Sequence, residues 1–127
     1  HPLMQRVVDL QRSRAKTMAE FGAIVARWDN FRREMLTFVQ SFDALLCPVC
    51  SFVGMVHGST YDRLPAFSYT MTYNLTGWPA AVVRAGTSPK GLPIGVQIVA
   101  PPWREDVALA VASFLEKALS GFLPPQI

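Results

Sequence analysis

The sequence predicts an α/β protein in which helices pack on a small mixed β-sheet. Its 127 residues are 50% hydrophobic and 17% charged, a composition that fits one domain with a sizeable core. Apolar residues recur at helical spacing in the first third of the chain and again near its end. Between these helical segments, two short apolar runs flank the turn Ser88-Pro89-Lys90-Gly91. We therefore expect residues 1–127 to form a single domain or a fragment of one, with few strands of its own.

Two helices are expected at the N-terminus. The first covers Leu3 to about Arg14, and the preceding Pro2 suits its first turn. The second begins at Met18, because Thr17 and Glu20 have the spacing of a capping box. Its apolar positions step by three and four residues and are Phe21, Ile24, Val25, Trp28, Phe31, Met35, Phe38, Val39 and Phe42. We expect this stripe to be core.

A strand, a loop and a short helix are expected in the middle of the chain. The apolar run 44–47 stops at Pro48, which is typical of a buried strand that ends where the ladder loses a donor. Residues 51–65 contain glycines and polar residues among scattered apolar ones and predict a loop. Residues 67–73 predict a short helix that closes at Asn74.

Two more strands and a final helix complete the prediction. The strands cover residues 80–85 and 94–100, and the second should alternate, with apolar side chains on one face. The helix opens after Pro101-Pro102 with two acids in its first turn and ends at Gly121. Its apolar face is expected to contain Ala108, Leu109, Ala112, Leu115 and Leu119.

Charge and composition exclude several classes of function. The net charge of +3 arises within residues 1–40, and no dense stripe of Lys and Arg with stacking aromatics is present, so we expect no nucleic-acid binding. The longest uncharged stretch, residues 64–83, contains Gly77 and Pro79, which argues against a membrane span. No signal-peptide pattern is visible. Two buried or incidental thiols favour a reducing compartment, and we expect a cytoplasmic protein. The chain starts at His1 without Met, which we interpret as a processed product or a fragment.

Two thiols and one imidazole are the candidate reactive groups of the sequence. Cys47 and Cys50 have dithiol spacing, but the residues after Cys50 do not predict the helix whose dipole would activate a thiolate. A small dithiol oxidoreductase is therefore an alternative to the preferred interpretation of two buried or incidental thiols. His57 would add a third zinc ligand or a general base, but structural zinc needs four ligands and no carboxylate is placed to orient the imidazole. We expect no metal, no cofactor and a structural His57.

Three ordered motifs resemble landmarks of the amidase signature family of hydrolases. They are residues 42–48, then Tyr69-Thr70 with residues 74–80, and then residues 91–99. The capped helix from Met18 and the C-terminal helix also match, so the resemblance covers nearly the whole chain. It implies the C-terminal part of that family's α/β fold. The matched landmark positions are Asp43, Pro48, Thr70, Asn74, Gly77, Pro79, Gly91, Pro93, Gly95 and Gln97.

The landmark glycines and prolines also have a physical interpretation. Gly77 and Pro79 bracket a reversal that leads into a strand, and Gly91 and Pro93 set up the turn into the next one. Gly95 leaves a strand position without a side chain, where another element can approach closely. These are features of a scaffold and supply no catalytic group.

The resemblance implies an activity for which this chain lacks the reacting groups. The family hydrolyses carboxamides with a Ser nucleophile, a second Ser in a cis peptide and a Lys base. This sequence contains no Ser-Ser or Gly-Gly pair, and Lys16, Lys90 and Lys117 all lie in surface contexts. We therefore expect no catalytic residue in this chain and a role as scaffold for a parent enzyme that acts on a small-molecule amide.

The expected partner is the missing N-terminal part of that enzyme, or a second copy of the chain through self-association. An alternative is a self-contained α/β interaction module that oligomerises or binds a partner through an apolar face. Solubility and oligomeric state distinguish the two, because a fragment should expose the face that a module buries in a defined dimer.

The resemblance also suggests a substrate class. The short helix before Asn74 lines part of the family's acyl pocket, and relatives that act on glutamine-like substrates tend to carry an acid where this chain has Phe67. Met71 follows one helical turn later. Two apolar side chains at these positions favour an apolar or aromatic acyl group, although plain core residues would look the same.

Overall fold

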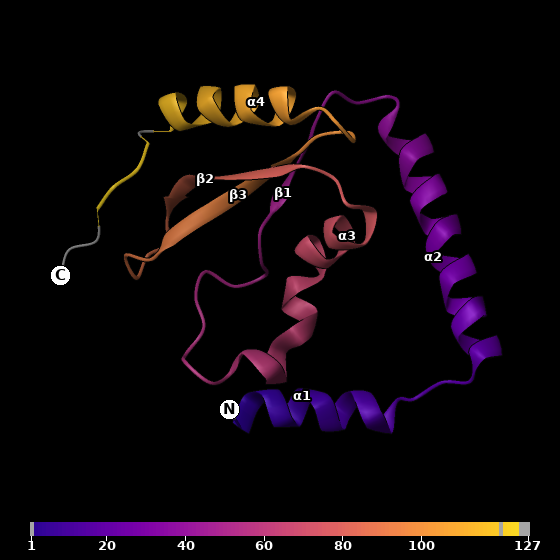
Figure 1. The fold of residues 1–127 in the computed structure, drawn as a ribbon. Coiled ribbons are helices and arrows are strands. Elements are labelled where there is room, and N and C mark those ends of the chain that lie inside the picture. The colour runs from indigo at the N-terminus through magenta and orange to yellow at the C-terminus, as the bar shows by residue number, and fades with distance from the viewer. Residues whose placement is uncertain (1, 120, 125–127) are drawn as a thin grey trace. The chain divides into compact units, whose positions relative to one another are not determined.

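The computed structural model describes residues 2–119 and 121–124, and it divides into two compact units, residues 1–34 and 35–127. His1, on which the expectation of a processed product rests, lies outside the described residues. The first unit holds α1 (Pro2–Ser13) and most of α2 (Met18–Val39), and α2 continues into the second unit (Figure 1). Both helices occur where the sequence predicts them.

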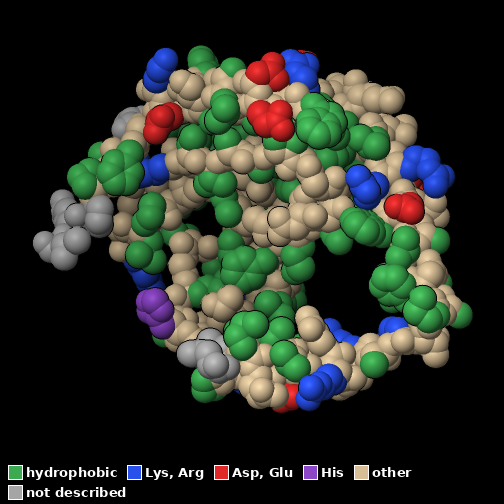
Figure 2. All heavy atoms as spheres, in the orientation of Figure 1, with side chains coloured by type: hydrophobic (Ala, Val, Ile, Leu, Met, Phe, Trp, Pro, Cys, Tyr) green, Lys and Arg blue, Asp and Glu red, His purple; other side chains and the backbone are tan. Residues whose placement is uncertain are grey.

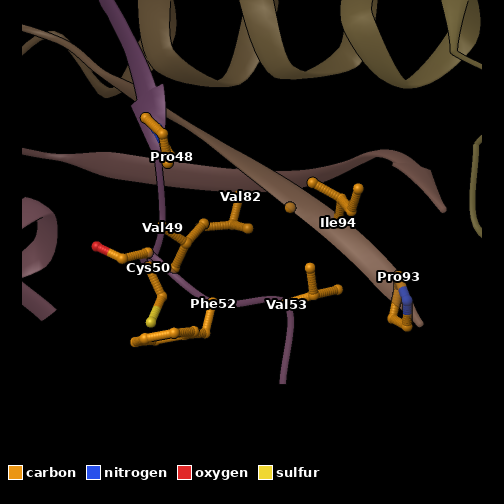
Figure 3. Close-up of a pocket in the computed structure, with 10 residues that line it drawn as sticks. Pro48, Val49, Cys50, Phe52, Val53, Val82, Pro93 and Ile94 are labelled. Carbon is orange, nitrogen blue, oxygen red and sulfur yellow. The ribbon is translucent and has the colours of Figure 1, made fainter. Parts of the chain in front are cut away.

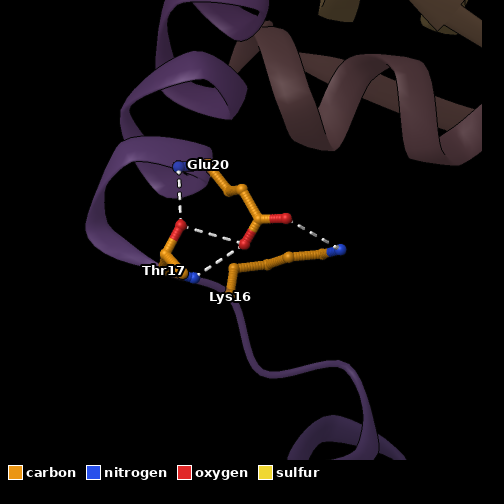
Figure 4. A network of polar contacts seen from close by, with 3 residues as sticks. All are labelled: Lys16, Thr17 and Glu20. Atoms are coloured by element: carbon orange, nitrogen blue, oxygen red, sulfur yellow. Dashed lines mark hydrogen bonds and ion pairs between the residues drawn. The ribbon is translucent and has the colours of Figure 1, made fainter.

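The predicted capping box at the start of α2 is confirmed (Figure 4). The Glu20 N–H donates to Thr17 Oγ1 at 3.2 Å, and the Thr17 N–H donates to Glu20 Oε2 at 2.8 Å. These bonds satisfy two of the donors that every helix start leaves unpaired. The Thr17 N–H, and after it the Thr17 hydroxyl, lowers the pKa of Glu20 from its usual 4.5. Lys16 Nζ lies 3.8 Å from the other carboxylate oxygen, on the surface.

The second unit is built on a three-stranded sheet (Figure 1). Its strands are β1 (Leu45–Pro48), β2 (Ala80–Thr87) and β3 (Pro93–Val99), in the order β1-β3-β2. Both pairings are antiparallel, so the α/β class is confirmed while the sheet within the described residues is antiparallel rather than mixed. A bulge between Arg84 and Gly86 interrupts the β2–β3 ladder near its turn.

Helices lie on both faces of this sheet (Figure 1). The helix α4 (Glu105–Ala118) runs along one face. On the other face lie η1 (Thr60–Phe67), a 3-10 helix, and α3 (Ser68–Thr76). The core contains Val39, Trp78 and Val99, with Met35, Leu45 and Tyr73 packed against it. The end of β3 is therefore the best-buried part of the sheet.

Several element boundaries differ from the prediction. The segment expected to be a loop up to Pro65 contains η1. Its backbone is irregular at Arg63 (φ −128°, ψ 27°), so the spacing of apolar residues does not indicate a helix there. The helix α3 passes Asn74 and ends at Gly77, where φ is 75° and the N–H donates to Tyr73 O at 2.8 Å. The helix α4 ends at Ala118, before Gly121.

The burial of side chains departs from the prediction more than the secondary structure does. Of the α2 stripe expected to be core, Val39 is buried, but Phe21, Ile24, Trp28, Phe38 and Phe42 are exposed. Leu109 of α4 is 63% exposed while Ala108 and Ala112 are buried. The end of β3 is buried on both faces, since Gln97, Ile98 and Val99 are all enclosed, so the predicted one-sided alternation is wrong there.

Large apolar side chains remain at the surface (Figure 2). In the second unit they include Leu46 of β1, Val82 of β2 and Phe114 of α4, which is 70% exposed. A periodic apolar stripe indicates which side of an element avoids water, but not which element covers it. These side chains are available to pack against other polypeptide.

Candidate functional site

The best-enclosed polar side chain of the second unit is Gln97, in the central strand β3. It is 2% exposed. Its Nε2 donates to Pro48 O of β1 at 3.2 Å and to Tyr69 O of α3 at 3.1 Å. The two amide hydrogens thus serve acceptors on both β1 and α3, so one side chain ties the β1–β3 pair to α3. A buried amide satisfied in this way fixes the position of α3 on the sheet.

Cys47 and Tyr73 extend this polar cluster. Gln97 Nε2 lies 3.2 Å from Cys47 Sγ, and the Cys47 thiol donates to Tyr73 Oη at 3.7 Å. Burial, followed by the contact with Cys47, raises the pKa of Tyr73 to about 12. Tyr73 is therefore a neutral phenol at physiological pH, which favours a structural role for this residue over acid–base chemistry.

Phe67 lies between two anchored stretches of backbone. On one side Ala66 O accepts a hydrogen bond from the Ser51 N–H at 3.1 Å, and on the other Tyr69 O accepts from Gln97. Thr70 Oγ1 also donates to Phe67 O at 3.0 Å. The predicted pocket residue thus has a fixed backbone while its side chain is only half-buried.

Met71 follows Phe67 by one turn, as predicted. The Met71 side chain is 43% exposed and that of Phe67 is half-buried, so both remain partly open to solvent. Neither residue lines the hollows described below. The landmark residues Asn74 and Thr70 lie on the same helix, Asn74 exposed and Thr70 half-buried.

A hollow of about 450 Å³ lies beside the end of β1 (Figure 3). Its walls come from the β1–η1 segment and from the β2–β3 hairpin, and they include Val49, Cys50, Phe52, Val53, Val82 and Ile94. Gly95 forms part of the same surface, where an added Cβ would lie 3.3 Å from Val49 Cγ2 and 3.3 Å from Val82 Cγ1. The close approach predicted at Gly95 is therefore made by these two side chains.

The remaining landmark residues shape turns and strand ends. Gly91 has φ 79°, and its N–H donates to Ser88 O at 2.9 Å while the Ser88 N–H donates to Leu92 O at 2.8 Å. These bonds close the hairpin before Pro93 begins β3. Pro79 O accepts from the Ala100 N–H at 3.1 Å, which joins the start of β2 to the end of β3. These contacts form the hairpin turn and join β2 to β3.

Asp43 lies in an exposed bend before β1. Pro48, which belongs to the same motif, ends that strand. The Arg104 side chain forms two hydrogen bonds with Asp106, at 3.0 and 3.2 Å, and these raise the pKa of Arg104. Asp43 adds a smaller contribution in the same direction. This charge cluster sits on the surface.

The thiols and His57 are not arranged as a reactive centre. Cys47 lies within β1 and Cys50 lines the hollow, so neither occupies the helix N-terminus that the redox interpretation requires. His57 lies in an exposed turn. Across residues 2–119 and 121–124, no group of three or more His, Cys, Asp or Glu side chains is placed to hold a metal ion. No helix in this described part of the chain is long and apolar enough to cross a membrane.

Sequence reasoning missed two features of this site. It named Gln97 as a landmark without a role, although a lone amide between Val96 and Ile98 in an apolar strand signals a buried hydrogen-bonding position. It also missed the hollow, because its walls come from segments that are distant in sequence, such as Phe52 and Val82.

Comparison with known proteins adds independent findings. The model of the Amidase family matches residues 2–109. Fatty-acid amide hydrolase 2 of Homo sapiens is 32% identical over 97 residues, which cover 76% of this chain and 18% of that protein. A glutamyl-tRNA(Gln) amidotransferase subunit of Roseobacter denitrificans is 35% identical over 94 residues, covering 70% of this chain and 19% of that protein.

Solved structures give the same result. The structure of 6-aminohexanoate cyclic dimer hydrolase complexed with substrate superposes with a TM-score of 0.72 at 29% identity, over 86% of this chain and 26% of that one. A crystal structure described as amidase superposes with a TM-score of 0.79 at 24% identity and supports the fold. The chain thus spans about a fifth of the length of the curated relatives it matches.

Proposed function

The chain belongs to the amidase signature family, and from that premise we propose that it supplies scaffold and one wall of the acyl pocket to an amide C–N hydrolase. In this proposal it contributes no reacting group. The serine nucleophile, the second serine and the lysine base come from polypeptide outside this sequence, which contains no Ser-Ser pair. Residues 1–127 then act as one segment of an amidase domain.

The observation that carries this proposal is the anchoring of the backbone around Phe67. Ala66 O accepts from Ser51, in the segment after β1, and Tyr69 O accepts from Gln97 of β3. The junction of η1 and α3 is therefore fixed against that segment and against β3. A binding wall needs side chains that are positioned by the scaffold and still open to a ligand. Phe67 and Met71 meet both conditions, since their backbone is fixed and their side chains are partly exposed.

The apolar character of this wall supports an apolar acyl group. Phe67 and Met71 offer dispersion contacts and no charge, so a fatty or aryl amide gains more from them than glutamine does. Three of the relatives carry names with different substrates: a fatty-acid amide, a glutamyl-tRNA and a cyclic dimer of 6-aminohexanoate. The choice among such classes for this chain therefore rests on its own residues Phe67 and Met71.

A chimera tests the proposal. The segment of fatty-acid amide hydrolase 2 that aligns with this chain is replaced by the corresponding residues of the chain, and hydrolysis of decanamide and glutamine is measured. We expect the folded chimera to hydrolyse decanamide and to prefer it over glutamine. A folded chimera without amidase activity would contradict the scaffold role.

Substitutions at Phe67 separate the pocket wall from the scaffold. Phe67→Asp should lower kcat/KM for decanamide by at least about tenfold, because a carboxylate would have to be desolvated against the acyl chain. Phe67→Leu is the matched control and should keep the preference for decanamide. Equal activity of the two variants would refute the pocket-wall role and leave the scaffold role intact.

A self-contained interaction module is the second candidate, and the exposed apolar side chains favour it. Leu46, Leu109 and Phe114 present uncovered apolar surface in the second unit. A defined dimer of the chain, stable at micromolar concentration in sedimentation experiments, would support the module. Concentration-dependent, open-ended association fits the fragment instead.

A further inference from the structure

A second hollow, of about 790 Å³, lies at the turn end of the β2–β3 hairpin. Residues 122–124, which follow α4 in the chain, line one side of the hollow. The walls include Arg84, Thr87, Gly91, Leu92, Phe122 and Leu123. Its volume lies within the range of roughly 300–1,000 Å³ that is typical of small-molecule sites.

Arg84 supplies a cation to this hollow. It is half-buried on β2, paired across the sheet with Gly95, which has no side chain to cover it. Its guanidinium donates to Thr87 Oγ1, a neutral acceptor. Neither of the ion pairs found in the described part of the chain, Lys16 with Glu20 and Arg104 with Asp106, involves Arg84. Several guanidinium donors are thus left for a ligand.

The surrounding sequence adds no negative charge. Between Arg63 and Glu105 the chain contains no Asp or Glu, while Lys90 in the hairpin turn adds a second cation close to Gly91. The other walls are apolar, and Leu92, Phe122 and Leu123 are all exposed. The hollow therefore combines a forked hydrogen-bond donor with apolar surface.

We propose that this hollow binds a small amphipathic carboxylate, meaning one carboxylate group on an aliphatic tail. The two carboxylate oxygens match the paired N–H donors of Arg84, a geometry that neutral head groups cannot match. The tail packs against Phe122 and Leu123. Arg84 is the one cation among the described residues that line the hollow, and Lys90 lies outside this lining. One guanidinium with apolar walls suits a carboxylate better than a phosphate, which usually accepts hydrogen bonds from several donors. The proposal does not depend on the proposed hydrolase function.

Decanoate is the probe, and binding to the full chain is measured by calorimetry. We expect saturable binding of decanoate and at least about tenfold weaker binding of decanol, which has the tail without the charge. Arg84→Gln should weaken decanoate binding by about the same factor and leave decanol unchanged. Arg104→Gln is the matched control, since Arg104 is paired with Asp106 and lies outside the hollow, and it should bind decanoate like the unmodified chain.

NMR of the Arg84 side chain keeps the test independent of the stability of the variant. In the unmodified chain, the Arg84 Nε–H resonance should shift on addition of decanoate and stay in place on addition of acetate, which lacks the apolar tail. Absence of saturable decanoate binding, decanol binding as tight as decanoate, or an unmoved Arg84 resonance at saturation would each overturn the proposal.

Discussion

Replacement of Gln97 by Met tests whether this side chain holds α3 on the sheet. Methionine has nearly the same length and volume, so it fills the site in the central strand and removes the amide donor. The hydrogen bonds of Gln97 Nε2 to Pro48 O at 3.2 Å and to Tyr69 O at 3.1 Å are lost. The variant therefore isolates the polar contribution of a residue that is 2% exposed.

The expected loss of unfolding free energy follows from the two carbonyl oxygens that lose their hydrogen-bond donor. A buried acceptor that loses its partner costs about 1–3 kcal/mol. Tyr69 O lies within α3, where it can still accept a helical hydrogen bond, and the bond to Pro48 O is only partly buried. The sum of the two costs should therefore fall near the low end. We expect a loss of about 2 kcal/mol in the free energy of unfolding, which corresponds to roughly 6–10 °C in Tm for a domain of this size.

Thermal and urea unfolding followed by far-UV circular dichroism measure this loss. The matched control is Gln40→Met, the same chemical change at an exposed position just after α2. It should change Tm by no more than about 1–2 °C, in line with ordinary surface substitutions. A Tm for Gln97→Met within that same margin of the unmodified chain would refute the assignment of Gln97 as the link between β1, β3 and α3.

Three further outcomes are expected from other parts of the structure. Because folding lowers the pKa of Glu20 from 4.5, its carboxylate stabilises the folded state above that pH, and this stabilisation is lost as pH falls through the lowered value. The amide proton of Thr17 should accordingly move upfield in an NMR titration from pH 6 to pH 2, and a shift independent of pH would contradict the capping box. Trp78, which is 6% exposed, should cost about 3–5 kcal/mol when replaced by Ala, whereas the same change at Trp103, which is 88% exposed, should cost less than about 0.5 kcal/mol by urea unfolding. Gly77→Ala should destabilise by about 1 kcal/mol through backbone strain alone, since φ is 75° and no atom lies within 4 Å of the added Cβ; an unchanged unfolding midpoint would show that the chain relaxes there.

Local signals in the sequence predicted the elements that local interactions create. The capping box at Thr17 and Glu20 and the turn of Ser88 and Gly91 both form between residues a few positions apart, so their spacing alone specifies the geometry. The helix α3 shows where such signals compete. Asn74 is a permissible end for a helix, but Gly77 adopts the left-handed conformation that ends it.

Tertiary features could not be predicted in the same way. The apolar stripe of α2 is correctly placed, yet Phe38 and Phe42 are exposed because no described element covers them. The role of Gln97 depends on Pro48 and Tyr69, which are brought to it by two separate segments. Periodicity identifies an apolar side, while burial and hydrogen-bond partners follow from the assembled fold.

In the proposed function, this chain serves an amidase as scaffold and acyl-pocket wall without supplying reacting groups. The most direct test compares decanamide hydrolysis by the chain alone with hydrolysis by the folded chimera with fatty-acid amide hydrolase 2. We expect no hydrolysis by the chain alone and restored hydrolysis in the chimera. Hydrolysis by the isolated chain, or a folded chimera that leaves decanamide intact, would contradict the account.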